Sequence, residues 1–376
     1  MHKKLYAALT LLVLAAMALS ACGGAATAEP VATEAPVVTE APVVTEAPVV
    51  TEAPLPGVGF RICQVTDTGG IDDKSFNATA WKGVTDAMAV YGVEGQYLES
   101  QEQADYERNI NAFLEQGCDL IITVGFFLGD ATSAAAVANP TVNFSIVDMA
   151  YDPTIPNVLG QVFRTDQAGF LAGYLAAGVS QTGVIGTFGG FQIPTVTAFM
   201  DGYALGAQYY NQQHGTSVTV LGWDPATQTG LFSMTFENAD EGRRLGESLM
   251  DEGADIIMPV AGPVGLGTAA AVLERGNAYI IGVDSDWFLT SPNYGSIVLT
   301  SVLKNMDVTV LDAVRMVVEG TFTGGMTVGD LPNGGVGLAP YHDLASLVSP
   351  ELQAELDAVQ AGIVDGSIAT TPPPAP

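Results

Sequence analysis

Short apolar runs alternate with longer stretches of helical periodicity from about residue 57 to residue 368. The apolar runs are rich in β-branched residues and predict strands at 60–66, 119–124, 142–147, 183–187, 255–259, 279–283 and 296–300. The periodic stretches predict helices at 77–91, 103–116, 167–179, 195–212 and 240–252. Continuous apolar strands that alternate with amphipathic helices are typical of parallel sheets covered on both faces. The pattern therefore predicts an α/β architecture.

A repeated motif divides this region into two similar halves. A helix that ends in glycine, followed by one residue, an aspartate and an apolar strand, occurs at 114–122 and again at 250–257. We therefore expect two doubly wound lobes. Because ligands of such sheets bind beyond the carboxyl ends of the strands, function should reside in the loops that follow these ends. The loops in question come after Thr66, Val124, Val147, Pro259 and Val283.

The N-terminus has the pattern of a bacterial lipoprotein signal. Lys3 and Lys4 precede an apolar run over residues 5–21, which ends in Leu-Ser-Ala before Cys22. This ending resembles a lipobox, so residues 1–21 are predicted to be a signal peptide and Cys22 the lipidated first residue of the mature chain. The alternatives are an ordinary secretory signal with a chance cysteine, or an uncleaved anchor.

Two low-complexity segments flank the predicted lobes. Residues 22–56 repeat the hexamer Val-Val-Thr-Glu-Ala-Pro, and a proline every six residues blocks helix formation. We interpret this segment as an extended tether between the lipid anchor and the folded body. The proline-rich residues 369–376 are predicted to be a disordered tail.

The charge of the chain restricts its partners. The sequence has 12 Lys and Arg residues against 41 Asp and Glu residues, which gives a formal net charge of −29. Nucleic-acid binding needs a basic surface that neutralises phosphates, so no nucleic-acid partner is expected. Direct binding to an anionic membrane surface is disfavoured for the same reason. The longest apolar segment of the body, at 170–179, is too short to cross a bilayer.

The most informative loop spans residues 67–77 and reads Asp-Thr-Gly-Gly-Ile-Asp-Asp-Lys-Ser-Phe-Asn. A glycine-rich loop before a helix is a candidate phosphate site, but three aspartates oppose an anion, and the loop lacks the spacing of known nucleotide motifs. The acids also lack the spacing of an EF-hand calcium loop. Capping of the following helix by Asp72, Asp73 or Ser75 is the purely structural alternative.

Three further segments, together with 67–81, carry a family resemblance. They are Gly-Phe-Phe at 125–127, Gly-Ala-Asp at 253–255 and Gly-Val-Asp-Ser-Asp at 282–286. In combination they resemble the basic membrane protein family of purine-nucleoside-binding lipoproteins. The resemblance implies a type I periplasmic-binding-protein fold with two hinged lobes, which closes on a nucleoside and delivers it to the permease subunits of an ABC importer. It implies a lipid-anchored protein on the extracytoplasmic face, which we expect to be a monomer without a cofactor.

The resemblance also implies lobe boundaries and ligand contacts. The first lobe would comprise residues 57–162 and about 284–323, and the second lobe residues 163–283 and about 324–368. Phe76 and Phe236 match the two aromatic rings that hold the base, and six other residues match further ligand contacts. These six are Asp67, Asn77, Phe126, Asp148, Asp284 and Lys304.

The chemistry of these residues suits a nucleoside independently of the family. A purine gains about 1–3 kcal/mol from each aromatic partner on which it stacks. The hydroxyl groups of a sugar can donate to carboxylates in a cleft. Each residue also has a structural alternative: a phenylalanine at a helix start is often core, a strand-end aspartate often caps a helix, and Lys304 could pair with Asp307.

Two segments depart from the family pattern. The stretch 223–234 is long and apolar, which makes Trp223 and Phe232 rivals of Phe236 for the second stacking ring. Pro263 interrupts the glycine turn at 261–267, where the family donates backbone N–H groups to the ligand. The base preference therefore does not follow from the resemblance.

Other functions remain as alternatives. A sugar or another polar solute could occupy the same kind of cleft. A nucleoside hydrolase could use Asp284 and Asp286, but the body offers only His214 and His342 and no nucleophile or metal motif, so no catalytic residue or metal site is assigned. Cys63 and Cys118 lie near adjacent predicted strands and could form a disulfide, although a buried free thiol is the commoner state of cysteine in apolar runs.

Overall fold

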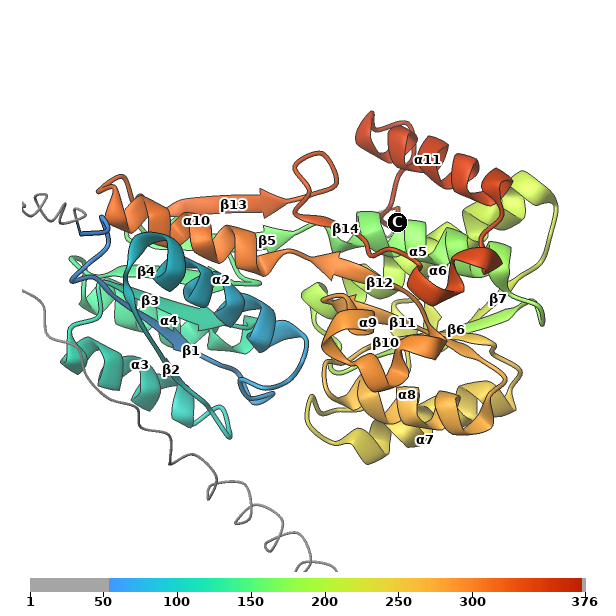
Figure 1. Cartoon of the computed structure of the whole chain (residues 1–376), viewed down its shortest axis with the longest axis horizontal. Coiled ribbons are helices and arrows are strands. Elements are labelled where there is room, and N and C mark those ends of the chain that lie inside the picture. The colour runs from blue at the N-terminus through green and yellow to red at the C-terminus, as the bar shows by residue number, and fades with distance from the viewer. Residues whose placement is uncertain (1–53, 374–376) are drawn as a thin grey trace, which may run out of the picture. The chain divides into compact units, whose positions relative to one another are not determined.

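The computed structural model describes residues 54–373, which form two parallel-stranded sheets with helices on their faces (Figure 1). The predicted signal peptide, Cys22 and the predicted tether up to residue 53 lie outside the described residues. None of the described helices is both long and apolar enough to cross a bilayer.

The first sheet has six strands in the order β13-β5-β4-β3-β1-β2, all parallel. Their bounds are β1 Arg61–Val65, β2 Glu94–Leu98, β3 Leu120–Val124, β4 Asn143–Val147, β5 Val158–Phe163 and β13 Gly325–Gly329. The first lobe is this sheet with its flanking helices. Those are α2 Phe76–Tyr91, α3 Asp105–Gln116, η1 Phe126–Leu128, α4 Gly129–Ala138 and α10 Met306–Val318.

The second sheet has the order β14-β12-β11-β10-β6-β7, with only the edge strand β14 antiparallel. Its strands are β6 Val184–Gly189, β7 Thr219–Leu221, β10 Ile256–Val260, β11 Tyr279–Asp284, β12 Val298–Lys304 and β14 Val336–Leu338. The second lobe adds α5 Thr165–Val179, α6 Pro194–His214, α7 Ala239–Asp251, α8 Val264–Arg275, α9 Trp287–Thr290, η2 Pro292–Ile297, η3 His342–Leu347 and α11 Pro350–Val364. A short hairpin joins β8 Trp223–Asp224 to β9 Thr229–Gly230.

Hydrophobic packing explains why the central strands read as continuous apolar runs. In the first sheet, Ile62 and Ile122 face a core shared with α2 and α10, whereas Cys63 and Ile121 face a second core with α3. All five residues of β3 are buried. In the second lobe, Figure 1 shows the sheet between the pair α5 and α6 and the pair α7 and α8. The predicted α/β class with two doubly wound lobes is confirmed.

The two sheet orders correspond strand by strand. β4 and β11 occupy equivalent positions, as do β3 and β10, and β1 and β6. The repeated helix–glycine–aspartate motif precedes β3 and β10, which are one of these equivalent pairs. Because the strands are parallel, their carboxyl ends gather the loops after β1, β3, β4, β10 and β11 at two comparable edges.

The chain crosses between the lobes at positions that differ from those expected. Residues 284–323 were expected in the first lobe, but β12 belongs to the second sheet, where Val283 pairs with Val302. Residues 324–329 were expected in the second lobe, but β13 pairs with β5 in the first sheet. The later crossings therefore lie near Asn305 and between β13 and β14, because strand pairing keeps β12 beside β11.

The start of the expected disordered tail is packed against the fold. Thr370 is buried, and its hydroxyl group bonds to the Asp166 carboxylate at the start of α5. The Arg164 guanidinium lies 3.4 Å from the same hydroxyl. The expectation of disorder from residue 369 onward is therefore wrong for Thr370, because a polar partner was available to this side chain.

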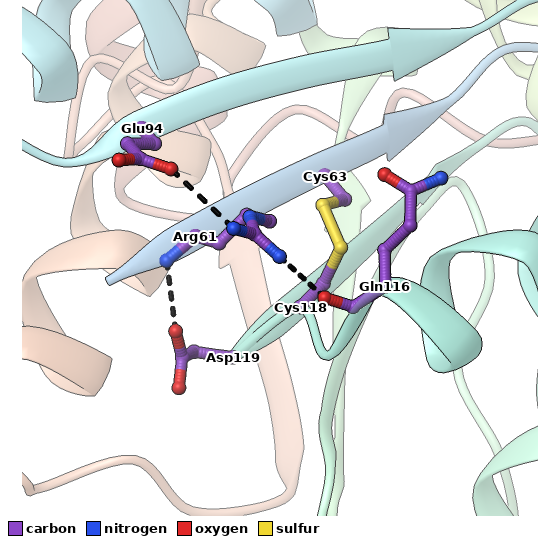
Figure 2. Close-up of a disulfide and its surroundings, with 6 residues drawn as sticks. All are labelled: Arg61, Cys63, Glu94, Gln116, Cys118 and Asp119. Carbon is purple, nitrogen blue, oxygen red and sulfur yellow. Dashed lines mark hydrogen bonds and ion pairs between the residues drawn. A yellow bond between two sulfur atoms is a disulfide. The ribbon is translucent and has the colours of Figure 1, made fainter. Parts of the chain in front are cut away.

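A disulfide joins β1 to the start of β3. Cys63 and Cys118 are bridged, with their Cα atoms 6.1 Å apart, so the free-thiol interpretation is corrected. The physical reason is that β1 and β3 are neighbours in the sheet. Figure 2 shows Arg61 beside the bridge, where its backbone N–H donates to Asp119 at 2.8 Å and its guanidinium donates to the Gln116 carbonyl.

Loss of this disulfide should lower the free energy of unfolding. The bridge closes a loop with a sequence separation of 55 residues, and such cross-links typically contribute about 2–4 kcal/mol. Cys63→Ala alone and the double variant Cys63→Ala with Cys118→Ala should lose similar amounts in urea unfolding. Reductant should destabilise the parent protein and leave the double variant unchanged. A parent protein that is insensitive to reductant would contradict the bridge.

Candidate ligand-binding site

A cavity lies at the carboxyl ends of strands from both sheets. It encloses about 600 Å³ of space not filled by protein atoms, part of which is continuous with solvent. Its lining residues are Asp67, Gly69, Asp73, Phe76, Gly125, Phe126, Phe127, Asp148, Ile193, Thr195, Val196, Phe199, Phe236, Val260, Ala261, Gly262, Pro263, Val283, Asp284 and Lys304.

Two of the lining aspartates occupy equivalent positions in the two lobes. Asp148 follows β4 and Asp284 ends β11, and these strands correspond in the sheet orders. Both residues adopt left-handed backbone conformations, with φ of 73° for Asp148 and 68° for Asp284. This region is costly for most side chains but accessible to aspartate, and it often occurs at functional sites. Each lobe thus turns one strand-end carboxylate into the cavity wall.

The loop after β1 builds a second acidic wall. Asp67 accepts hydrogen bonds from the Asn77 amide at 2.7 Å and from the Gly69 N–H at 3.1 Å. Asp73 accepts from the backbone N–H groups of Ser75, Asn77 and Ala78 at 2.7–3.0 Å, and so caps helix α2. Asp73 is therefore the helix cap among the three candidates considered from the sequence.

Asn77 is not among the lining residues of the cavity, and its contact with a ligand stays a prediction. Its side chain is fully buried, and its amide donates to Asp67 and, at 3.2 Å, to Asp73. It therefore holds the two carboxylates in position.

Burial raises the pKa of the four cavity carboxylates. Desolvation raises the pKa of Asp67 to about 6, although the hydrogen bond from Asn77 opposes the shift. Desolvation likewise raises the pKa of Asp73 to about 7 against its backbone donors. The pKa values of Asp148 and Asp284 are also raised by desolvation, and the charge of Lys304 lowers both in part.

Lys304 is the buried cation of the site. It ends β12, is only 2% exposed, and its ammonium nitrogen lies 2.6 Å from Asp148 Oδ2. It does not pair with Asp307, which instead accepts from Lys82 at 3.0 Å. The ammonium also lies 4.7 Å from the centre of the Phe76 ring, a favourable cation–π arrangement.

The aromatic residues of the cavity come from both lobes. Phe76 and Phe126 belong to the first lobe and Phe236 to the second. Phe236 packs tightly over Gly190, where a Cβ atom would lie only 2.1 Å from the ring. Phe191 contacts Phe236 in an edge arrangement at 5.1 Å between ring centres.

The two rival rings lie outside the cavity. The Trp223 indole is buried and donates to Asp201 at 2.8 Å. Phe232 packs edge-on against Trp223 at 5.9 Å between ring centres and covers Gly189. Of the three candidates for the second ring, Phe236 is therefore the one that lines the cavity.

Sequence reasoning missed part of the apolar wall. Ile193, Val196 and Phe199, at the start of α6, line the cavity, as does Phe127. Phe127 could have been found from the sequence, because it belongs to the Gly-Phe-Phe turn that follows β3. The apolar residues of α6 have the pattern of a helix that packs into the core, so nothing in the sequence marks them as cavity residues. Gly262, with a φ of 54°, lines the cavity beside Pro263, which has no N–H to donate.

The other titratable groups considered from the sequence lie elsewhere. His342 bonds to Asp286 at 2.7 Å, and Asp286 caps α9, so Asp286 does not join Asp284 in the cavity. His214 pairs with Glu355 at 3.0 Å. No group of acidic, His or Cys residues within 54–373 has the arrangement of a metal site. The cavity thus combines aromatic surfaces with carboxylate acceptors and one paired ammonium.

The fold and the position of the cavity indicate the general class of protein. Two doubly wound lobes with a ligand cavity at their strand ends are the arrangement of periplasmic-type solute-binding proteins. The chain belongs to the family of PnrA-like ABC transporter substrate-binding proteins, which matches residues 61–370.

Curated relatives cover most of the chain. It is 31% identical over 322 residues to the ABC transporter nucleoside-binding protein BmpA of Lactococcus lactis subsp. cremoris, a match that covers 81% of this chain and 87% of the relative. It is 32% identical over 305 residues to basic membrane protein A of Borreliella burgdorferi, with 80% and 84% covered. The suspected family is therefore confirmed.

Solved structures share the same fold. An ABC transporter solute-binding protein from Aeropyrum pernix K1 matches with a TM-score of 0.75 and 27% identity, covering 84% of this chain and 94% of that one. The glucose-galactose binding protein GanP of Geobacillus stearothermophilus matches with a TM-score of 0.55 and 16% identity, covering 76% and 99%. The second match concerns the fold alone.

Neutralising Asp67 should stabilise the protein in a pH-dependent way. Because its pKa rises from 3.8 to about 6 on folding, the folded state keeps a proton that the unfolded chain loses. Ionisation therefore lowers stability as the pH rises from about 4 to about 6, by up to about 3 kcal/mol above pH 6. Asp67→Asn should unfold at a higher temperature than the parent protein above pH 6 and at nearly the same temperature below pH 4.

Thermal unfolding scans between pH 4 and pH 8 measure this difference. The matched control is Asp343→Asn, which changes an exposed aspartate outside the cavity and should show no comparable pH dependence. A constant difference between Asp67→Asn and the parent protein across the whole range would contradict the buried ionisation.

Proposed function

We propose that the protein captures a purine nucleoside in this cavity and delivers it to the permease of an ABC importer. The observation that carries the proposal is the meeting of Phe76 and Phe236, from different lobes, with the strand-end carboxylates of Asp67 and Asp284 in one cavity. A purine nucleoside is both a flat aromatic surface and a polyhydroxyl donor, and it needs both kinds of partner. The relative from Lactococcus lactis is named as a nucleoside-binding protein, which supports the same substrate class.

The base would lie against the aromatic residues. Phe76 begins α2 and Phe236 stands on the opposite lobe, so closure of the lobes brings a ring to each face of a planar ligand. Stacking contributes about 1–3 kcal/mol per ring and tolerates different purines, because every base has a π surface. The apolar residues Val196 and Phe199 extend this surface in the second lobe.

The ribose would lie against the carboxylates. Ionised Asp67, Asp148 and Asp284 are acceptors only, and the hydroxyl groups of a sugar are donors that match them. Charge-assisted hydrogen bonds of this kind are stronger than neutral ones. Asp148 already holds Lys304, so Asp67 and Asp284 are the acceptors with the greater capacity for the sugar.

The same charges disfavour phosphorylated ligands. Four carboxylates line the cavity, and the one lining cation, Lys304, is paired with Asp148. A 5′-phosphate would bring about two further negative charges, and an unpaired buried charge costs several kcal/mol. The protein would therefore select nucleosides over nucleotides.

A lipid anchor would hold the protein outside the cytoplasm. We infer from the lipobox that Cys22 carries diacylglycerol and that the proline-rich segment tethers the body to the membrane. The intact mass of the N-terminal peptide from membrane-purified protein tests the anchor. A Cys22 peptide without lipid mass would exclude it.

Calorimetry with a ligand panel tests the substrate class. Adenosine, guanosine and inosine should bind, while their monophosphates, the free bases and ribose should bind much more weakly. Removal of the ribose hydroxyls should cost about 1–3 kcal/mol for each carboxylate left without its donor. Tight binding of a monophosphate would contradict the electrostatic argument. Tight binding of ribose alone would favour a sugar-binding protein. Release of free base from inosine would indicate a hydrolase.

Removal of either stacking ring should weaken nucleoside binding. Phe76→Ala and Phe236→Ala should each lower the affinity by about 1–3 kcal/mol, or roughly ten- to a hundredfold, with little loss of fold. The matched control is Phe232→Ala, because this ring precedes Phe236 by four residues but lies outside the cavity. An equal loss of affinity in Phe232→Ala and Phe236→Ala would show that Phe236 is wrongly assigned as the second stacking ring.

A further inference from the structure

Ser75 occupies the capping position of helix α2 but does not cap the helix. Serine at this position normally accepts a hydrogen bond from a backbone N–H of the first helical turn. Here the Ser75 side chain makes no such bond, and Asp73 accepts from the N–H groups of Asn77 and Ala78 in its place. The Ser75 hydroxyl group is therefore available to a partner outside its own helix.

That partner lies in the other lobe. The Ser75 hydroxyl donates to Asp284 Oδ2 at 2.8 Å, and its oxygen lies 3.1 Å from the Val283 carbonyl. Ser75 belongs to the first lobe, whereas Val283 and Asp284 end β11 of the second sheet. Ser75 is 1% exposed and Asp284 is 7% exposed, so water competes little for this contact.

A second contact joins the same two loops. The Ser285 hydroxyl of the second lobe donates to the Lys74 carbonyl at 2.9 Å. Lys74 has a φ of 59° and Asp284 a φ of 68°, so both loops present these groups from left-handed backbone conformations. The two contacts run in opposite directions, because each lobe supplies one hydroxyl donor. Neighbouring residues of both loops, Asp73 and Asp284, line the cavity.

We propose that Ser75 is a positioning residue that latches the two lobes over the bound ligand through Asp284. The inference rests on the proposed function, because Asp284 is assigned there to the sugar. The hydroxyl fixes one oxygen of Asp284, which orients the carboxylate toward the cavity, and it couples that orientation to closure of the lobes. Ser75 itself does not line the cavity and needs no contact with the ligand.

The latch predicts a particular kinetic signature. A ligand enters while the lobes are apart, so a contact that forms only after closure has little effect on association. Loss of the contact destabilises the closed complex and accelerates ligand release. For Ser75→Ala we expect the dissociation rate of inosine to rise about five- to tenfold, while the association rate changes less than about twofold.

Stopped-flow kinetics with inosine tests this signature, with Ser145→Ala as the matched control. Ser145 is also buried, and within residues 54–373 its hydroxyl bonds only to Leu159 and Gln161 of its own sheet. Ser145→Ala should lower the unfolding temperature without changing either rate. Unchanged dissociation from Ser75→Ala, or an equal acceleration in Ser145→Ala, would overturn the latch.

A measurement without ligand separates this inference from the proposed function. The lobes of the unliganded protein also sample the closed state, in which the contact between Ser75 and Asp284 forms. In hydrogen–deuterium exchange of the unliganded protein, Ser75→Ala should therefore accelerate exchange at residues 284–290 of the opposite lobe, whereas Ser145→Ala should not. Unaltered exchange in Ser75→Ala would overturn the latch even where inosine binds. If the parent protein binds no nucleoside, the proposed function fails and the exchange result alone decides the latch.

Discussion

The burial of several carboxylates around a single ammonium group is the constraint on which the rest of the site depends. Desolvation raises the pKa values of Asp67, Asp148 and Asp284, so each is less stable as an anion than it would be in water. The fold offsets part of this cost with Lys304 and with donors from the 67–77 loop. What remains is an unfilled capacity to accept hydrogen bonds, which is the property that a polyhydroxyl ligand can satisfy.

The correspondence between the lobes explains how two similar halves make an asymmetric site. At the ends of the equivalent strands β4 and β11, an aspartate lines the cavity, Asp148 in the first lobe and Asp284 in the second. The other equivalent loops differ, because β1 leads into Asp67 whereas β6 leads into Gly190 and Phe191. Most of the acids therefore come from the first lobe, while the second supplies an aliphatic and aromatic wall. A ligand with one polar and one flat apolar end has a single favoured orientation in such a cavity.

The strands predicted from the sequence all lie in the interior of the two sheets, whereas the edge strands and the interior strand β5 were missed. The helices α4, α8, α10 and α11 were missed as well. The seven predicted strands and five predicted helices are all present, and their bounds differ by at most two residues except at the end of β12, which lies four residues later than predicted. The strand β2 is half exposed, and β13 alternates between exposed and intermediate residues, so neither shows a continuous apolar run. The missed edge strand β13 also explains the wrong lobe boundary, because its pairing with β5 cannot be read from periodicity.

The residues predicted to contact a ligand gather at one cavity, and their contact with a ligand stays a prediction. Seven of the eight predicted ligand contacts line the cavity, because strand ends of a parallel sheet share one edge. Asn77 is the one that does not line it, since the sequence does not reveal which way the first turn of a helix faces. The disulfide between Cys63 and Cys118 forms because β1 and β3 are neighbours in the sheet. The sequence alone does not reveal which strands are neighbours.

The loop at 67–77 shows why a short motif can identify a site better than any of its residues alone. Gly69 leaves room beside the Asn77 amide, where a Cβ atom would lie at 3.2 Å, and Gly70 takes a φ of 72° that turns the chain. Asp73 caps α2, which leaves the Ser75 hydroxyl for the opposite lobe. Asn77 then holds Asp73 and the first strand-end carboxylate together. Because these residues are linked by hydrogen bonds, the motif as a whole sets the capping of α2, the ionisation of the cavity and the contact between the lobes.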